Sequence, residues 1–594
     1  TNALIGAPRA QQTFLSLESE KFDSIATNKK QYIFQETDTT FYDVSPQRYG
    51  DYGHTGSAQA LTSAFTTAIN DATVTVHWTA NGAVAGDFVT FASVTAPVGS
   101  GYVNSDFEKE FEIQTVATNS FTIEMASNAA ATVATNGSAT ATIQLNTGDA
   151  TSVLGFGWSA GTWSQSTWGT ARPSTVDIDA ANWTLDLYGE DIIATQFNSG
   201  TYIWDTSAYK SSMLPMINII DYDTTVAAPY FTRDKHTTTV PHKSLFSLVS
   251  TPDRHLVLFG ASDVGASTNQ DPMMVRFSDQ ENITDFKATS TNTAGFQRLS
   301  DGSEIRAAVR SRGQILIWTD TSLHSMQFIG PPFTFGFKQQ GRQCGCVGQH
   351  AAVDVDGVAY WMGSSGGFLM YDGSVQTIPC TVEDYVFNDI RLVPEIYTAV
   401  NDEFNEISWF YPSSNSNTID KVVTYNHLEK VWSVGTLSRT TWADKGVFAK
   451  PYATEYNQTS TATATPTVQG VTSGRGFLYA QETGNNANGT ALPANLTSGD
   501  FYLQQGEELV SISRFIPDFK NLDGTVNVTL QLTNYPATAK VGSPLGPFAI
   551  TSSTTKRDCR ARARQVALYI ASSALNDAWR FGTFRADIQP AGRR

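Results

Sequence analysis

The chain has 594 residues, of which 41% are hydrophobic and 16% are charged, and its formal net charge is −17 at pH 7. A chain of this length has room for several domains with sizeable cores. The acidic balance argues against a general nucleic-acid-binding protein, because contacts with phosphates need a basic footprint.

The polar residues are mostly Thr, Ser, Asn, Gln and Gly, which favours pleated strands joined by turns and therefore an all-β fold. Residues 1–53 are predicted to be N-terminal strands that join the main β body. Residues 54–148 are predicted to be an inserted, small β-sandwich-like domain. Three of its segments alternate apolar and polar residues, the pattern of half-buried strands: Gly86–Phe91, Phe107–Met125 and Ala139–Asn146.

Residues 149–450 repeat a theme of strand, polar turn, apolar strand and further strand, in which the apolar strand often ends in an aromatic residue. Five such units are visible: Leu185–Asp205, Ser247–Asp263, Ala307–Gly330, Ala351–Gly373 and Thr398–Pro412. Their spacing of about 45 to 60 residues fits the four-stranded blades of a β-propeller, with about five to seven blades.

Two turns and one helix inside this region can be predicted from local chemistry. Asp356-Gly357 and Asp372-Gly373 are expected to form type I′ hairpin turns, because Asp-Gly tolerates the positive φ that these turns require. The segment 381–390, TVEDYVFNDI, is the best helix candidate, with Thr381 and Asp384 resembling a capping box.

Residues 451–594 are predicted to form a C-terminal β-domain with a basic terminus. The last 39 residues contain nine basic and three acidic residues, so they carry +6 and leave −23 for the rest of the chain. A basic patch that meets an acidic neighbour is one route to ordered assembly, and the alternative is an ordinary solvated strand face. The candidate interface residues are Lys556, Arg557, Arg560, Arg562, Arg564, Arg593 and Arg594.

Two motifs resemble functional sites but lack the required context. Gly363–Gly367, GSSGG, has the spacing of a nucleophile elbow, yet it joins two apolar strands and no helix follows. Asp354–Gly357 resembles part of a calcium loop, but Ala352 and Gly363 would occupy two of the ligand positions, so a hairpin turn is expected.

Further candidates for metal or acid–base chemistry are also incomplete. Cys344 and Cys346 have no second Cys or His pair at zinc-ligand spacing, so we expect buried thiols or thiols without a function. Glu108, Glu110 and Glu112 could supply paired carboxylates for glycoside cleavage, but such a row is more typical of the solvated side of a strand. We therefore predict no catalytic residue, no metal and no cofactor.

The absence of a disulfide framework and of a membrane span bears on the compartment. Four cysteines in a chain of this length suit a reducing compartment such as a cytoplasm. No run approaches the roughly 18 consecutive apolar residues of a membrane span, and TNALIGAPRAQQTF does not resemble a secretion signal. We expect a soluble protein without a membrane segment.

One stretch resembles a known family. Phe277-Ser278 with Asp285-Phe286, Gly302-Ser303, Ile315–Trp318, and Gly341-Arg342 before Gly348 mark the segment 277–363. This segment resembles the central part of the tail nozzle proteins, also called tail tubular protein B, and of the related packaged-DNA stabilisation proteins of podoviruses, the short-tailed bacteriophages. The segments WTLDLYGEDIIATQFNSGTYIWD and WRFGTFRADIQPAGRR are similar to the same family.

The resemblance implies a non-enzymatic structural virion protein that bears a β-propeller. It implies a homo-hexameric ring below the portal and the adaptor, or head–tail connector, protein, with tail fibres as further partners. Phage DNA would pass through the lumen without sequence-specific binding, and an acidic wall would let it slide. The ring would retain the genome and then release it. The location implied is the virion tail, assembled in the bacterial cytoplasm.

Two alternatives from other functional classes stay open. A host-glycan-binding tail protein is one, because Trp158, Trp163 and Trp168 could stack on sugars, although such spacing is more typical of packing. A polysaccharide depolymerase on a β-propeller is the other.

Overall fold

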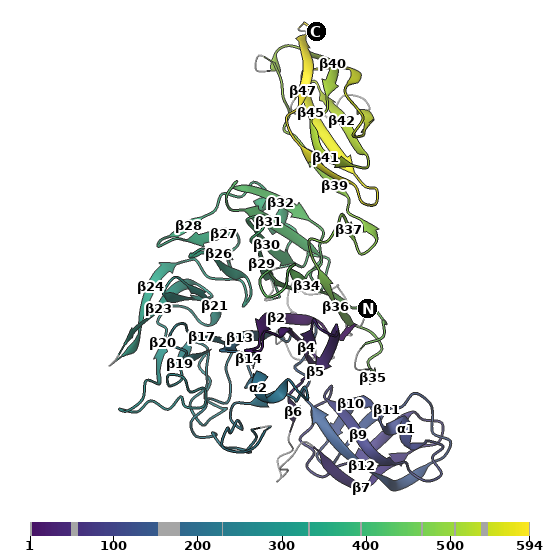
Figure 1. Cartoon of the computed structure of the whole chain (residues 1–594), viewed down its shortest axis with the longest axis vertical. Helices are drawn as coiled ribbons and strands as arrows, with labels where there is room; N and C mark the ends of the chain where they lie inside the picture. The colour runs from purple at the N-terminus through teal and green to yellow at the C-terminus, as the bar shows by residue number, and fades with distance from the viewer. Residues whose placement is uncertain are drawn as a thin grey trace, which may run out of the picture. The chain divides into compact units, whose positions relative to one another are not determined.

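The computed structural model forms two compact units, Thr1–Gln481 and Glu482–Arg594, both built almost entirely of strands (Figure 1). The described helices are short: α1 (Asn104–Phe107), α2 (Thr206–Tyr209) and α3 (Glu383–Phe387). No helix among the described residues is long and apolar enough to cross a membrane. The structure describes residues 3–48, 58–152, 179–228, 230–330, 333–391, 395–464, 467–503, 506–535 and 544–592.

Seven four-stranded antiparallel sheets dominate the first unit, and they are numbered here as blades 1 to 7. Figure 1 shows the sheets fanning around a common centre. Blade 1 contains β2 (Pro8–Leu15), β3 (Lys21–Thr27), β4 (Gln31–Gln35) and β5 (Thr40–Asp43). Blade 2 contains β13 (Trp183–Tyr188), β14 (Asp191–Gln196), β15 (Thr201–Trp204) and β16 (Ile217–Asn218). Blade 3 contains β17 (Phe246–Val249), β18 (Leu256–Phe259), β19 (Met274–Phe277) and β20 (Gly295–Arg298).

The remaining blades follow in chain order. Blade 4 contains β21 (Ile305–Ser311), β22 (Gln314–Thr319), β23 (Ser322–Gly330) and β24 (Thr334–Arg342). Blade 5 contains β25 (Ala352–Val355), β26 (Val358–Met362), β27 (Phe368–Tyr371) and β28 (Val375–Thr377). Blade 6 contains β29 (Tyr397–Asn401), β30 (Glu406–Tyr411), β31 (Lys421–Asn426) and β32 (Val431–Gly435). Blade 7 contains β33 (Thr441–Ala443), β34 (Tyr452–Asn457), β36 (Arg475–Ala480) and the N-terminal β1 (Leu4–Ile5).

Hydrophobic cores link each blade to the next around the whole ring. The Phe22 and Trp204 rings meet between blades 1 and 2, with centroids 6.1 Å apart. The Trp318 and Trp361 rings, on the second strands of blades 4 and 5, lie 5.3 Å apart. Because neighbours cover both faces of a blade, middle strands such as β18 and β22 are nearly continuous apolar runs. The predicted β-propeller is therefore confirmed, and it has seven blades.

The propeller extends beyond the predicted range of 149–450. Blade 1 precedes the insertion, and blade 7 joins β33, β34 and β36 to β1, with Leu4 opposite Gly476. The strands that were expected only to join the main body thus form a whole blade and close the ring. For the same reason the second compact unit begins at Glu482 rather than at 451.

The local predictions inside the propeller have mixed outcomes. Asp356 and Gly357 both have positive φ, 53° and 84°, as a type I′ turn requires. At the second site only Gly373 is left-handed, in a longer loop between β27 and β28, so the type I′ prediction is wrong there. The helix within 381–390 exists as α3, but its N-cap is Val382, so the capping box is absent.

The insertion is a closed barrel rather than a sandwich. Its strands pair in the order β11-β8-β7-β12-β9-β10, and β10 pairs back with β11. The alternating residues enclose a separate core that contains Phe65, Phe91 and Phe111. The strands are β6 (Gln47–Arg48), β7 (Gln59–Thr67), β8 (Thr73–His77), β9 (Phe88–Thr95), β10 (Glu110–Ala117), β11 (Ser120–Glu124), β12 (Val133–Gln144) and the later β35 (Val468–Gln469), which pairs with β10.

The second unit is a β-sandwich with one core between its sheets. One sheet contains β39 (Ala494–Thr497), β45 (Gln565–Ser572), β42 (Val526–Thr533) and β43 (Leu545–Ile550). The other contains β44 (Arg557–Ala563), β40 (Val510–Ile516) and β47 (Arg585–Pro590). Two small pairs complete the unit: β41 (Phe519–Asp523) with β46 (Ala578–Phe581), and β37 (Asn486–Ala487) with β38 (Thr490–Ala491).

Candidate functional site

The basic residues that were predicted as an assembly surface lie on and beside β44, an edge strand of the sandwich. Cys559, Ala561 and Ala563 are buried in its core, whereas Arg560 and Arg562 are exposed. This alternation follows from the pleat, which sends successive side chains to opposite faces. Small residues therefore face inward, and the guanidinium groups form a row on the outer face.

The seven predicted residues do not form a single free patch. Arg564 donates to the backbone carbonyl of Glu507 and lies over the Tyr535 ring, 5.6 Å from its centroid, so it holds a neighbouring loop. Arg562 donates to the carbonyl of Ala591 (2.9 Å). Within the described residues, Lys556, Arg557 and Arg560 form no ion pair, and all three are exposed. Arg593 and Arg594 lie outside the described residues.

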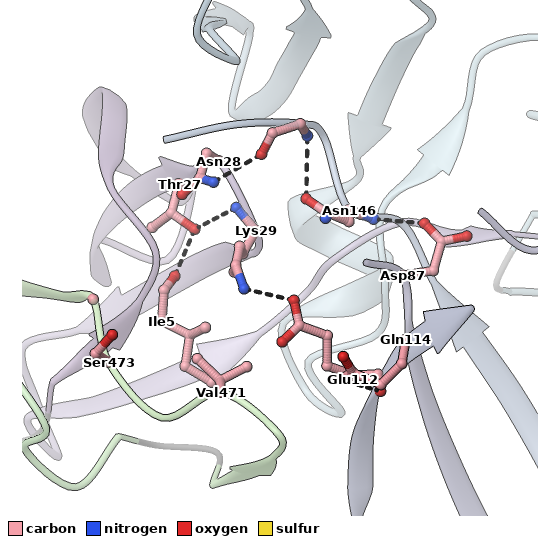
Figure 2. A network of polar contacts seen from close by, with 12 residues as sticks. Ile5, Thr27, Asn28, Lys29, Asp87, Glu112, Gln114, Asn146, Val471 and Ser473 are labelled. Carbon is pink, nitrogen blue, oxygen red and sulfur yellow. Dashed lines mark hydrogen bonds and ion pairs between the residues drawn. The ribbon is translucent and has the colours of Figure 1, made fainter. Parts of the chain in front are cut away.

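Acidic side chains on β10 form ion pairs with blade 1, whereas the sequence suggested a solvated strand face. Glu112 forms an ion pair with Lys29 in the β3–β4 turn of blade 1, with 2.7 Å between Oε1 and Nζ (Figure 2). The same turn is tied to the chain that leaves the barrel, because Asn28 donates to the carbonyl of Gly148 (2.8 Å). Asn146 is held in turn by its backbone N–H, which donates to Asp87 (3.0 Å). These contacts fasten the barrel to blade 1.

Lys30 forms the buried centre of this attachment. Its side chain has no exposed surface, and its ammonium pairs with Asp43 of blade 1 (2.7 Å) and with Glu110 of the barrel. Burial alone would lower the pKa of Lys30, but the two carboxylates outweigh it and raise the pKa. The row Glu108, Glu110, Glu112 is therefore not a solvated strand face: Glu110 is buried, Glu112 is half-buried and paired, and only Glu108, which precedes β10, is exposed.

The propeller axis is crossed by side chains from several blades. Arg310 on β21 forms a two-pronged ion pair with Asp186 on β13 (2.8 and 2.9 Å) and donates to the carbonyl of Val249 on β17. Asn182 donates to the Gln349 side chain (2.7 Å), which links blades 2 and 5 from opposite sides of the ring.

A cavity of about 370 Å³, called here the axial cavity, lies among the inner strands of blades 1 to 6. His350 in its wall donates from Nε2 to the carbonyl of Trp183 (2.8 Å), and burial lowers the pKa of His350 to about 4, so it is neutral at pH 7. Side chains of Arg310, Asp186, Asn182 and Gln349 bridge the blades around this small space, so it leaves no room for a DNA duplex, which is wider than its own major groove of about 12 Å. The axis of a single propeller is thus no passage for DNA.

A second cavity, of about 440 Å³, lies beside β14 and β15 and contains two contrasting carboxyl groups. Burial raises the pKa of Asp191 to about 7, partly opposed by a hydrogen bond from the backbone N–H of Thr206. Hydrogen bonds from Thr225 and Lys235 hold the pKa of Asp223 well below its usual range. A carboxylic acid and a carboxylate with separated pKa values in one cavity can serve acid–base chemistry.

The motifs that were set aside in the sequence have structural explanations. Cys344 and Cys346 are buried thiols in the core shared by blades 4 to 6, as predicted. Gly345 between them touches the backbone of the loop at Asp320, where a Cβ would lie 2.0 Å from the carbonyl oxygen. Ser365, the serine at the centre of the GSSGG motif, lies exposed in the turn between β26 and β27, and strand β27 rather than a helix follows it. Its neighbour Ser364 donates to the Asp320 carbonyl (2.8 Å). Among the described residues, no group of His, Cys, Asp and Glu could hold a metal ion. Trp158, Trp163 and Trp168 lie outside the described residues.

The sequence did not single out Lys30, Asp186 or Gln349. A signal was present only for Asp186, which is a charge inside the apolar strand WTLDLY. Lys30 lies in the polar turn between β3 and β4, where a lysine is ordinary. Gln349 carries no comparable signal, since its role depends on a blade far away in the sequence.

No protein-family model matches the sequence, and no curated protein is similar to it. Similar solved structures include the phage phi92 endosialidase, at 7% identity and a TM-score of 0.14, covering 83% of this chain and 44% of the other. An exo-β-1,3-galactanase from Phanerochaete chrysosporium has 9% identity and a TM-score of 0.21, covering 73% and 100%. BamB from Moraxella catarrhalis has 10% identity and a TM-score of 0.25, covering 51% and 84%. This chain spans less than half the length of the endosialidase. Likenesses this distant carry no functional argument.

Proposed function

We propose that this chain is the structural subunit of the tail nozzle of a short-tailed bacteriophage. Six copies form a ring below the portal and the adaptor, the DNA channel continues through that ring, and the ring retains the genome until it is released. The protein acts in the virion tail after assembly in the host cytoplasm. Tail fibres and the adaptor are its protein partners.

The observation that carries the proposal is the uneven distribution of charge. The first unit has 27 basic and 47 acidic residues, whereas the second has 12 basic and 9 acidic residues. Lys556, Arg557 and Arg560 project from the second unit without an ion-pair partner among the described residues. Opposite charges on different surfaces of one chain favour contacts between unlike faces of neighbouring copies, and such contacts close into rings when the rotation permits.

The blocked propeller axis is compatible with this arrangement. The Arg310–Asp186 ion pair and the Asn182–Gln349 hydrogen bond link non-adjacent blades across the inside of the ring, so in the proposed assembly the DNA passage lies between copies. Seven blades closed by β1 form a stiff body, which suits a wall. The segment 277–363, which resembles nozzle proteins, contributes parts of blades 3, 4 and 5.

The alternative for the basic row is protection of an edge strand. Charged side chains on such a strand prevent pairing with other molecules, and among the described strands β44 pairs only with β40 in its sheet. The two explanations differ in what happens when the charge is reversed. If the row is an assembly interface, charge reversal should abolish assembly. If the row only protects the edge of β44, charge reversal should change nothing, because Glu prevents edge pairing as well as Arg does.

Electron microscopy of virions tests the proposal directly. We expect six copies of this chain in a ring next to the adaptor, with DNA in the central passage. Density for this chain in distal fibres instead of a ring would refute the nozzle assignment.

A charge-reversal pair tests the surface. The double variant Arg557→Glu and Arg560→Glu should abolish ring formation and production of infectious particles without unfolding the chain. The matched control is Lys520→Glu with Arg580→Glu, two exposed basic residues on β41 and β46 of the same unit. Normal assembly of the β44 variant would show that this row is not the interface.

A second candidate function, polysaccharide cleavage, is favoured by the cavity that contains Asp191 and Asp223. Asp191 would supply a proton and Asp223 would remain ionised. The purified chain would then degrade host polysaccharide, and Asp191→Asn would remove the activity without lowering the melting temperature. No release of reducing ends by the wild-type chain would exclude this function.

A further inference from the structure

Two almost fully buried side chains in the wall of the axial cavity have polar atoms without a partner. Gln349 is 8% exposed, and its Nε2 has no hydrogen-bond acceptor among the described residues. Thr398 is 9% exposed, and its hydroxyl is likewise unpaired within the part of the chain that the structure describes. Buried polar groups are almost always hydrogen-bonded, because an unpaired one loses its hydrogen bonds to water and gains none in exchange. These groups therefore mark a place in the wall where a further polar partner fits.

The backbone segments that carry these two side chains are bridged, and both side chains line the same cavity. Residues His350 and Tyr397 form a parallel bridge between the starts of blades 5 and 6, and the Thr398 N–H donates to the His350 carbonyl (2.8 Å). The other end of the Gln349 amide is already occupied, because its Oε1 accepts from Asn182 (2.7 Å). The Gln349 Nε2 is thus a positioned donor and not a freely rotating amide.

A third group in the same wall supplies an acceptor. One carboxylate oxygen of Asp354 accepts from the Gly357 N–H (3.0 Å), while its Oδ2 is buried and has no partner among the described residues. The cavity thus presents a donor, an acceptor and a hydroxyl that can do both. A ligand with several hydroxyl groups matches this set, because each hydroxyl both donates and accepts.

The charged groups of the cavity disfavour an anionic ligand. Arg310, the only arginine among the described wall residues, is neutralised by both oxygens of Asp186. His350 is neutral at pH 7, so no unpaired cation in the described wall would attract an anion. A volume of about 370 Å³ lies near the lower end of the range of about 300–1,000 Å³ for ligand pockets.

We propose that the axial cavity binds one neutral pyranose unit through Gln349, Thr398 and Asp354. Apolar wall residues such as Leu248 and Val353 contact the C–H faces of the ring. The site is independent of the proposed ring, because it lies inside one propeller and needs no second copy.

Titration calorimetry of the full chain with D-glucose, D-galactose and N-acetyl-D-glucosamine tests the site. At least one of them is expected to bind saturably with one site per chain and a dissociation constant below about 10 mM. D-glucuronate should bind more weakly than the neutral sugars. No saturable binding by any of the three sugars, or tighter binding of glucuronate, overturns the proposal.

Thr398→Val identifies the site, because valine keeps the shape and removes only the unpaired hydroxyl. We expect about tenfold weaker sugar binding and no decrease in the melting temperature of the sugar-free protein. The matched control is Thr424→Val on β31 of the same blade, whose hydroxyl bonds to Ser408 (2.7 Å) and which does not line the cavity. Unchanged sugar affinity in Thr398→Val, or a clear loss of stability without sugar, contradicts the assignment.

Discussion

Asp23 on β3 of blade 1 should make the stability of the propeller depend on pH. Its side chain is fully buried, one carboxyl oxygen accepts a 2.6 Å hydrogen bond from Gln11, and the other has no partner among the described residues. Burial raises the pKa of Asp23 from 3.8 to about 8, and the bond from Gln11 opposes this only in part. At neutral pH the folded chain therefore carries this carboxyl in its protonated form.

The sign of the effect follows from which state binds the proton. Between pH 3.8 and about 8 the folded state holds a proton that the unfolded state has released. The contribution of Asp23 to the free energy of unfolding is thus fully present below pH 3.8 and decreases by about 1.4 kcal/mol per pH unit above it. Across the whole window the loss reaches at most about 6 kcal/mol.

Asp23→Asn removes this titration and keeps the size of the side chain. We expect the difference in free energy of unfolding, variant minus wild type, to increase by about 1.4 kcal/mol per unit from pH 5 to pH 8. Urea denaturation of both proteins at each pH measures it, and any constant cost of asparagine cancels. Asp38→Asn, at an exposed position of the same blade, should change the slope much less. Parallel pH curves for Asp23→Asn and wild type would refute the reasoning.

Three further changes test the packing around the candidate sites. Lys30→Met leaves Asp43 and Glu110 without their cation and should lower the free energy of unfolding by about 3–5 kcal/mol, measured by urea denaturation. Adding Glu110→Gln to that variant should restore part of the loss, and no recovery would show that the pair does not share one interaction. Gly345→Ala should destabilise blade 4 by about 1–3 kcal/mol in thermal melts, because its Cβ would overlap the carbonyl of Asp320. Unchanged stability of the Gly345→Ala variant would mean that the loop at Asp320 moves away from the added methyl group without cost.

Local sequence patterns were sufficient to identify the blades. Alternation, apolar middle strands and the Asp356-Gly357 turn reflect interactions between residues a few positions apart, and all five predicted units fall in the observed sheets. The number of blades could not be counted in the same way, because blade 1 precedes the barrel and blade 7 combines β1 with strands beyond Thr441. Pairing between strands that lie so far apart in the chain produces no periodic pattern in the sequence.

Charged residues were harder to interpret than apolar ones. The row of glutamates around β10 looks like a solvated face in the sequence, yet Glu110 is buried because Lys30, 80 positions earlier, reaches it. Conversely, the seven basic residues predicted as one patch include Arg564, which holds a loop of its own unit. A charged side chain needs either an ion-pair partner or water, and only the tertiary structure decides which of the two surrounds it.

The sequence by itself determined the all-β class and the blade pattern, because pleat and turn geometry act over a few residues. Only the tertiary structure decided that the ring has seven blades, that its axis is crossed by Arg310 and Gln349, and that Lys30 fastens the barrel. These features depend on contacts between residues far apart in the chain, which form only when the whole ring closes.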